Sequence, residues 1–238
     1  MDFVFMYETT LRIASGVPLM LQLAGISTTV GAAFAMLLAL MRVSAVKPLD
    51  LAARSYVFVF RGTPLLVQIF LIYYGLGQFP EVRSTFLWTF LREPYWCAIL
   101  ALTLNTAAYG SEIIRGGLLS VPAGEVEAAR ACGMSGLLLF RRIVLPIAVR
   151  QALPAYGNEL VLMVKATSLA SIITLMEVTG IAHKIISETF RGIEVFICAG
   201  ATYLLINFLL IRAVYAVEHW LSPHLRHAVS VTGAPARA

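Results

Sequence analysis

The chain has 238 residues, of which 59% are hydrophobic and 13% are charged, and its mean hydropathy is +0.83. Soluble domains are about 45–50% apolar and about 25% charged, so this composition excludes an ordinary soluble domain. The net charge of +5 is not accompanied by a basic stripe with interleaved aromatic residues, which argues against a nucleic-acid partner.

Long apolar segments predict membrane-spanning helices. Four segments carry no charged side chain, namely residues 13–41, 62–80, 94–111 and 195–211. A fifth segment, residues 160–176, is interrupted only by Lys165. Because a helix needs about 20 apolar residues to cross a bilayer, we expect an all-α integral membrane protein with five transmembrane helices.

The distribution of Lys and Arg predicts the orientation of these helices, because cytoplasmic loops carry the excess of positive charge. With the N-terminus outside, the inside segments hold twelve of the 18 Lys and Arg residues and the outside segments hold five, which leaves Lys165 within the membrane. The sequence therefore predicts the N-terminus out and the C-terminus in. We expect residues 1–222 to form one transmembrane domain and residues 223–238 to form a disordered cytoplasmic tail.

The second apolar segment begins with a helix-start signal. Thr63 is expected to be the N-cap and Pro64 the first helical residue, which is where each residue type is favoured. Arg61, just before them, is expected to be an interfacial anchor or a loop clamp more than a solute ligand.

Polar side chains within the third and fourth apolar segments mark a candidate solute pathway, because such groups at membrane depth usually face a cavity or a partner. In the third segment, Asn105, Tyr109 and Glu112 share one helix face by their spacing. The candidate pathway residues are Asn105, Tyr109, Glu159, Lys165, Thr167 and Ser168.

Each of these polar groups has a structural alternative. Hydroxyl and amide groups, among them Ser171 and Thr174, could simply hold neighbouring helices together. Glu112 could pair with Arg115 near the cytoplasmic end of its helix. Lys165 has no suitable partner at helical spacing, so we expect its partner to be another subunit or the carboxylate of a solute.

The connection at about residues 115–151 faces the cytoplasm on this topology, and it contains helix start and stop signals. Ser120 is expected to cap a first short helix that ends at Gly133. Ser135 is expected to cap a second helix, and Pro146 is expected to bend the chain. The first helix is rich in alanine, which gives it a smooth surface suited to docking in another protein.

The same connection carries a spaced motif. Glu127, Ala128 and Ala129 are followed after three residues by Gly133, and after nine more by Ile143-Val144-Leu145-Pro146. This pattern resembles the EAA motif of ABC-importer permeases. FRGTPLLVQ (residues 60–68), LNTAAYGSEIIRGG (104–117) and LPAYGNELVLMVKATSLAS (153–171) extend the resemblance to the polar amino-acid permeases, over about residues 10–220. The nearest group is the M subunits of octopine, nopaline and basic amino-acid systems.

The resemblance implies a type I ABC importer permease fold in a bacterial inner membrane, with no cofactor. It implies three kinds of partner: a second permease subunit (a homologous Q-type subunit or another copy of this chain), two cytoplasmic ABC ATPase subunits and a periplasmic amino-acid-binding protein. Glu127, Ala128, Ala129, Gly133 and Arg142 would couple the chain to the ATPase. Cys132 stands where the family often has Asp, which weakens the expected polar cap before the glycine.

The implied activity is import of polar, in particular basic, amino acids or opines by alternating access. No Gly-Lys dipeptide occurs in the chain, so the phosphate-binding P-loop is missing and no enzyme activity is expected. The alternatives are the same family with glutamine or glutamate as the solute, or an ion-coupled secondary carrier, although no internal repeat of the kind found in many such carriers is visible.

A membrane-embedded enzyme is disfavoured, because the four histidines lie in outside loops or in the tail. His224 and His227 are spaced to share a metal ion, but a solvated tail explains them better, and no metal site is expected. Cys97, Cys132 and Cys198 show no CxxC spacing and are expected to be apolar packing residues.

Overall fold

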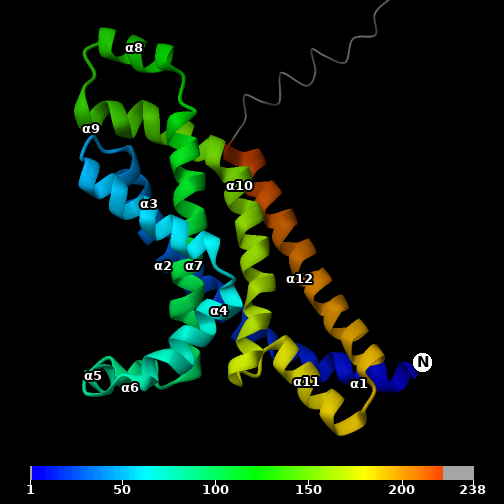
Figure 1. Cartoon of the computed structure of the whole chain (residues 1–238). Helices are drawn as coiled ribbons and strands as arrows, with labels where there is room; N and C mark the ends of the chain where they lie inside the picture. The colour runs from blue at the N-terminus through cyan, green and yellow to red at the C-terminus, as the bar shows by residue number, and fades with distance from the viewer. Residues whose placement is uncertain (1, 222–238) are drawn as a thin grey trace, which may run out of the picture.

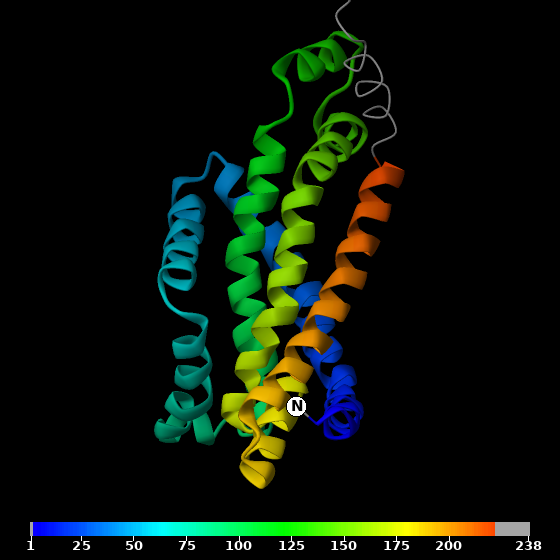
Figure 2. The ribbon, with the colours of Figure 1, turned by 90° about the vertical axis from the view of Figure 1, so that its right-hand side faces the viewer.

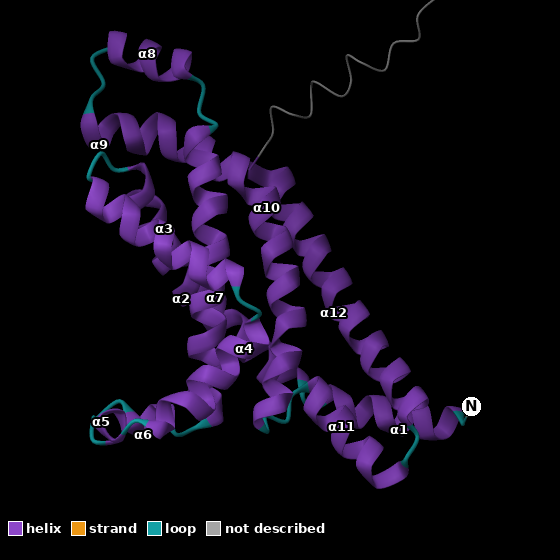
Figure 3. Cartoon of the chain, in the orientation of Figure 1, coloured by secondary structure: helices purple, strands orange, loops and turns teal. Residues whose placement is uncertain are grey.

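The computed structural model describes residues 2–221, and these residues form helices joined by short loops, with no strand among them (Figure 3). Two short π-helical turns, η1 (Leu71–Gly75) and η3 (Phe140–Val144), and two 3-10 helices, η2 (Leu76–Gln78) and η4 (Thr167–Ile173), occur among the α-helices. In chain order the elements are α1 (Phe3–Ala14), α2 (Val17–Val43), α3 (Lys47–Gly62), α4 (Leu65–Phe70), η1 (Leu71–Gly75), η2 (Leu76–Gln78), α5 (Pro80–Arg83), α6 (Trp88–Leu91), α7 (Pro94–Leu119), α8 (Ala123–Ala131), α9 (Gly136–Leu139), η3 (Phe140–Val144), α10 (Leu145–Ala166), η4 (Thr167–Ile173), α11 (Val178–Thr189) and α12 (Gly192–Leu221).

Three helical stretches among the described residues are long and apolar enough to cross a membrane: Phe3–Val43, Pro94–Leu119 and Gly192–Leu221. The count rises to five if each of two bent helix pairs forms one span. Each of the five apolar segments expected from the sequence falls on a different one of these three stretches and two bent pairs. The all-helical class is confirmed, although two of the expected spans are not single straight helices.

The first bent pair corrects the prediction for residues 42–80. The uncharged segment at residues 62–80 predicts a helix that begins near residue 63, whereas α3 already covers Lys47–Gly62 and meets the stretch Leu65–Gln78 at 103°. The hydropathy signal misses α3 because Lys47, Asp50, Arg54 and Arg61 interrupt its apolar residues.

The second bent pair joins residues 136–173 to α11 at 47°. The α-helical part ends at Ala166, and η4 leads to Thr174, whose backbone is left-handed with φ of 70°. A 3-10 helix has three residues per turn, so Thr167, Ser171 and Thr174 do not share one face as they would on an α-helix. Glu177 then caps α11, because its fully buried carboxylate accepts hydrogen bonds from the backbone N–H groups of Thr179 and Gly180.

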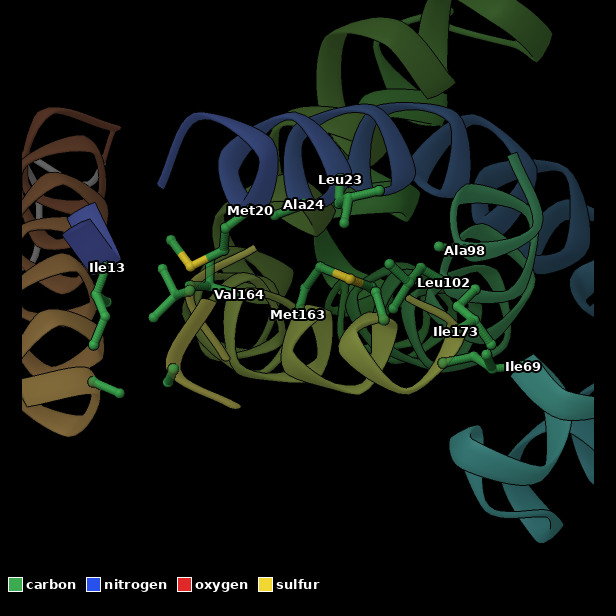
Figure 4. Close-up of a cluster of buried hydrophobic side chains, with 14 of the residues drawn as sticks. Ile13, Met20, Leu23, Ala24, Ile69, Ala98, Leu102, Met163, Val164 and Ile173 are labelled. Atoms are coloured by element: carbon green, nitrogen blue, oxygen red, sulfur yellow. The ribbon is translucent and has the colours of Figure 1, made fainter. Parts of the chain in front are cut away.

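The main hydrophobic core lies where α2, α7 and α10 meet (Figure 4). Met20 and Leu23 of α2, Leu102 of α7 and Met163 of α10 are buried together there. The helices approach closely at Gly117, where a Cβ atom would lie 2.6 Å from the carbonyl oxygen of Ala148. Burial of these side chains fixes α7 between its two neighbours, and α7 carries polar residues of the site described below.

Outside this core, α12 presents a largely apolar surface. Leu204 is 72% exposed and Phe208 is 57% exposed. Such exposed apolar surface is unfavourable in water, so it indicates contact with lipid or with another subunit.

The two ends of the bundle differ (Figures 1 and 2). One end carries α8, α9 and the C-terminal end of α12, and the opposite end carries α1, α5, α6 and α11. The N-terminal helix and the C-terminal end of α12 therefore lie at opposite ends, as the expected topology requires. The expected tail at residues 223–238, with His224 and His227, lies outside the described residues.

Candidate functional site

The charged connection forms an exposed projection at one end of the bundle, made of α8, α9 and the adjoining turn η3 (Figure 1). Between the two helices, Gly133 has φ of +79°. Its N–H donates to the Arg130 carbonyl at 2.9 Å, and the Met134 N–H donates to the Ala129 carbonyl at 3.0 Å. These two bonds form a Schellman motif, which requires a left-handed residue where glycine is favoured. The expected helix stop at Gly133 is thus confirmed.

The other helix signals of this connection are confirmed only in part. Ser120 does not cap α8: it ends α7, where its hydroxyl donates to the Gly117 carbonyl, and Pro122 holds the N-cap position instead. Ser135 does occupy the N-cap of α9, without a side-chain hydrogen bond.

The chain bends between α9 and α10 (Figures 1 and 2), and Pro146 lies in the first turn of α10. The helix does not end there, however, because the turn η3 precedes the proline. In this turn the Leu145 N–H donates to the Phe140 carbonyl, five residues earlier. The wider turn keeps the chain helical next to a residue that has no N–H to donate.

The expected coupling residues lie on this projection. Glu127, Ala128, Gly133 and Arg142 are exposed, whereas Ala129 is only 6% exposed and packs inward. Leu137 of α9 is 78% exposed. Cys132 is exposed as well, so the expectation of three packing cysteines is right for the buried Cys97 and Cys198 and wrong for Cys132.

A cavity of about 460 Å³ lies at the break between α3 and α4, and residues of α7 and α10 line its other sides. Its polar lining includes Arg61 and Thr63 from the break, Asn105 and Tyr109 from α7, and Glu159 from α10. The structure therefore brings together Asn105, Tyr109 and Glu159, which the sequence placed in one candidate pathway from two separate segments.

Charges of both signs line this cavity. The Arg61 guanidinium lies over the Tyr109 ring, 5.0 Å from its centroid, an arrangement that favours a cation–π interaction. Glu159 is 9% exposed, and within residues 2–221 its carboxylate makes neither a hydrogen bond nor an ion pair. A buried carboxylate that makes no hydrogen bond is costly, and the positive charge of Arg61 offsets part of this cost, so this wall of the cavity is suited to cationic groups.

Three of the expected pathway residues do not line the cavity. The Thr167 hydroxyl is buried and donates to the Val164 carbonyl at 2.7 Å. The Ser168 hydroxyl donates to the Lys165 carbonyl at 2.7 Å. Lys165 is exposed, and its ammonium group makes no hydrogen bond or ion pair within the described part of the chain.

The expected N-cap at Thr63 is wrong. Thr63 ends α3, and Pro64 is the N-cap of α4. The role that sequence reasoning missed belongs to Gln68, a buried residue of FRGTPLLVQ whose side chain contacts the break. A polar residue within an apolar segment is a signal that could have identified it.

A network of ion pairs lies between the cavity and the projection. Arg42 of α2 contacts both Asp50 of α3, at 3.2 Å, and Glu112 of α7, at 2.5 Å. Glu112 also binds Arg115 at 2.8 Å, which confirms the pairing expected as its structural alternative. Asp50 also forms an ion pair with the exposed Arg54. The network ties α2, α3 and α7 together, and α7 leads directly to the projection.

The described residues offer no group of three or more His, Cys, Asp or Glu side chains placed to hold a metal ion. The site therefore consists of a charged cavity and an exposed helical projection.

The chain is similar to known transport permeases. The chain is 61% identical over 226 residues to the octopine transport system permease protein OccM of Rhizobium radiobacter, covering 95% of this chain and 92% of that protein. It is 42% identical over 209 residues to the histidine/lysine/arginine/ornithine transport system permease protein HisM of Escherichia coli (strain K12), covering 87% and 88% of the two chains.

The fold is similarly matched. A solved chain, described as the crystal structure of an amino acid ABC transporter with histidines, superposes with a TM-score of 0.82 at 35% identity, covering 92% of this chain and 98% of that one. The all-helical arrangement is thus that of a type I ABC permease. Residues 31–223 match the family described as binding-protein-dependent transport system inner membrane component. The chain belongs to this family of inner membrane transport components.

Proposed function

We propose that the chain is the transmembrane permease subunit of a binding-protein-dependent ABC importer for basic amino acids or opines. The observation that carries the solute class is the cavity, in which Glu159 and Arg61 present opposite charges. An amino acid has both a carboxylate and an ammonium group, and a basic amino acid adds a second cation. Arg61 would receive the carboxylate and Glu159 a cationic group, with Asn105 and Tyr109 between them.

The energy for transport comes from a separate ATPase subunit. The exposed projection, with Glu127, Ala128, Gly133 and Arg142 on its surface, is suited to a groove in a cytoplasmic ATPase. Ala129 supports the projection from inside. On this proposal ATP binding moves the projection, and the helices open the cavity alternately to either side. The chain itself performs no covalent chemistry.

The remaining partners follow from the same assignment. A periplasmic binding protein delivers the solute at the end with α1 and α11, and two ATPase subunits bind the end with α8. The N-terminus is then outside, the C-terminus is in the bacterial cytoplasm, and the chain crosses the inner membrane five times. A second permease subunit, either a homologous Q-type subunit or another copy, packs against the exposed apolar surface. Lys165 is exposed and would face this subunit or the solute, supported by the neighbouring Thr167 and Ser168.

Two alternatives make different predictions. An ion-coupled carrier would need no ATPase, and the exposed projection would then have no role. A member of the same family that carries glutamine or glutamate would present a single ammonium group to the cavity, whereas a basic solute adds a second cation, so loss of the Glu159 charge should weaken uptake of a basic solute more.

Uptake measurements test the proposal. Labelled octopine, arginine, histidine and glutamine would be supplied to cells that carry the complete transport operon, with this chain present or deleted. We expect uptake of octopine or a basic amino acid to depend on the chain, and glutamine uptake to change little. Uptake of all four solutes that persists at full rate after deletion would contradict the proposal.

A further inference from the structure

The break between α3 and α4 leaves backbone carbonyl groups without helical partners. The last four carbonyls of any helix lack an N–H partner within it, and α3 ends at Gly62. The Phe60 carbonyl would normally accept from residue 64, but residue 64 is a proline and has no N–H. At membrane depth, such a broken helix persists only where other groups satisfy the freed carbonyls.

Gln68 supplies these groups from the first turns of α4. Its Nε2 lies 2.8 Å from the Phe60 carbonyl oxygen, 3.1 Å from the Thr63 carbonyl oxygen and 2.9 Å from the Thr63 hydroxyl oxygen. The amide has two N–H donors, so these acceptors share them. The side chain of Gln68 thus replaces the backbone hydrogen bonds that the break removes.

The other end of the same amide binds α7. Gln68 Oε1 accepts a hydrogen bond from Asn105 Nδ2 at 3.1 Å. Gln68 is only 6% exposed and is not one of the residues that line the cavity, whereas Asn105 and the break residues do line it. One buried amide therefore connects two walls of the cavity.

We propose that Gln68 is a positioning residue, which holds the α3–α4 break against α7 and thereby places Arg61 and Asn105 around the solute. This inference rests on the proposed function of the cavity. Gln68 acts through its neighbours and does not touch the solute. Its loss should therefore disturb the use of the cavity more than the assembly of the importer.

The test uses the complete importer, reconstituted in proteoliposomes with its ATPase and binding protein, and measures labelled arginine or octopine transported per ATP hydrolysed. Gln68→Met keeps the length of the side chain and removes its hydrogen bonds. We expect the transported amount per ATP to fall about fivefold or more, because the Thr63 carbonyl loses its side-chain donor and the Phe60 carbonyl keeps only the 3.5 Å bond from Asn105 Nδ2. Gln78→Met is the matched control, because Gln78 is exposed and makes only a 3.4 Å bond to the Tyr74 carbonyl.

A second variant separates positioning from stability. Gln68→Asn keeps the amide but shortens the side chain by one methylene, so it is less disruptive to insertion, and it should also lower the amount transported per ATP. If both Gln68 variants transport as much solute per ATP hydrolysed as the wild type, the inference is overturned. It would equally be overturned if transport and ATP hydrolysis fell only in proportion to the amount of assembled complex.

Failure of the proposed function would look different. In that case the wild-type complex itself would transport neither arginine nor octopine in response to ATP, whatever residue stands at position 68.

Discussion

Two of the helix breaks among the described residues are stabilised in different ways. The break at Gly133 is exposed and is completed by backbone hydrogen bonds within its own segment. The break at residues 63–64 is completed by Gln68, and Gln68 is itself held by Asn105 from α7. An exposed break can rely on water and on one left-handed glycine, whereas a break beside a cavity in the bundle needs side chains from other elements. The first should therefore respond to local backbone changes and the second to changes in distant side chains.

The largest effect is expected from Gly133→Val. A β-branched residue at φ of +79° is strained by about 1–2 kcal/mol, so the angle between α8 and α9 should change. We expect ATP-driven uptake to fall at least about tenfold, a loss of about 1.4 kcal/mol or more in coupling, while the amount of chain in the membrane stays the same. The measurement is uptake together with quantitative immunoblotting of membranes.

Two controls sharpen this experiment. Gly124→Ala in α8 meets open space and should leave uptake unchanged. Gly133→Asn should retain part of the activity, because asparagine tolerates the left-handed region. Full uptake by Gly133→Val would show that transport does not depend on the angle between α8 and α9. The break at Gly133 would then lack the sensitivity to local backbone changes that the comparison of the two breaks requires.

A smaller and solute-specific effect is expected from Glu159→Gln, which changes charge with almost no change in shape. Arginine uptake should fall about fivefold relative to glutamine uptake, which corresponds to roughly 1 kcal/mol of lost attraction. Glu188→Gln provides the control, since Glu188 is an exposed carboxylate on α11, away from the cavity. Equal losses for arginine and glutamine would mean that Glu159 supports the fold and does not select the solute.

The smallest effects concern the ion pairs that join the two regions. Arg42→Met should lower the stability of the purified complex by about 1–2 kcal/mol, because its side chain is 13% exposed and serves two carboxylates. Arg54→Met should change the stability of the complex far less, since that side chain is 62% exposed and its ion pair is screened by water. Thermal unfolding in detergent would detect the difference. Equal midpoints for the two variants would contradict the assigned role of the network.

The same contrast explains what could be predicted from the sequence. The projection depends on neighbouring residues, so Gly133 and Ser135 were placed correctly from their types and spacing. Long apolar segments likewise predicted the helical class and the position of α7. Asn105 and Tyr109 could be grouped because a single helix carries both.

Features that depend on packing between helices were missed. Thr63 carries a good capping signal, but the chain bends at Pro64 and the cap position shifts to the proline. Ser120 was misplaced because α7 continues to Leu119, which makes Ser120 the end of one helix and not the start of the next. The role of Gln68 depends on the 103° angle between two segments, and no local pattern encodes that angle.

The most direct test of the account measures what energises transport. Proteoliposomes would contain the complete importer with this chain, its ATPase and its binding protein, and would be loaded either with ATP or with an imposed proton or sodium gradient but no ATP. The account predicts uptake of octopine or arginine only with ATP, and its loss in Gly133→Val. Uptake driven by the ion gradient without ATP, and unchanged by Gly133→Val, would contradict it.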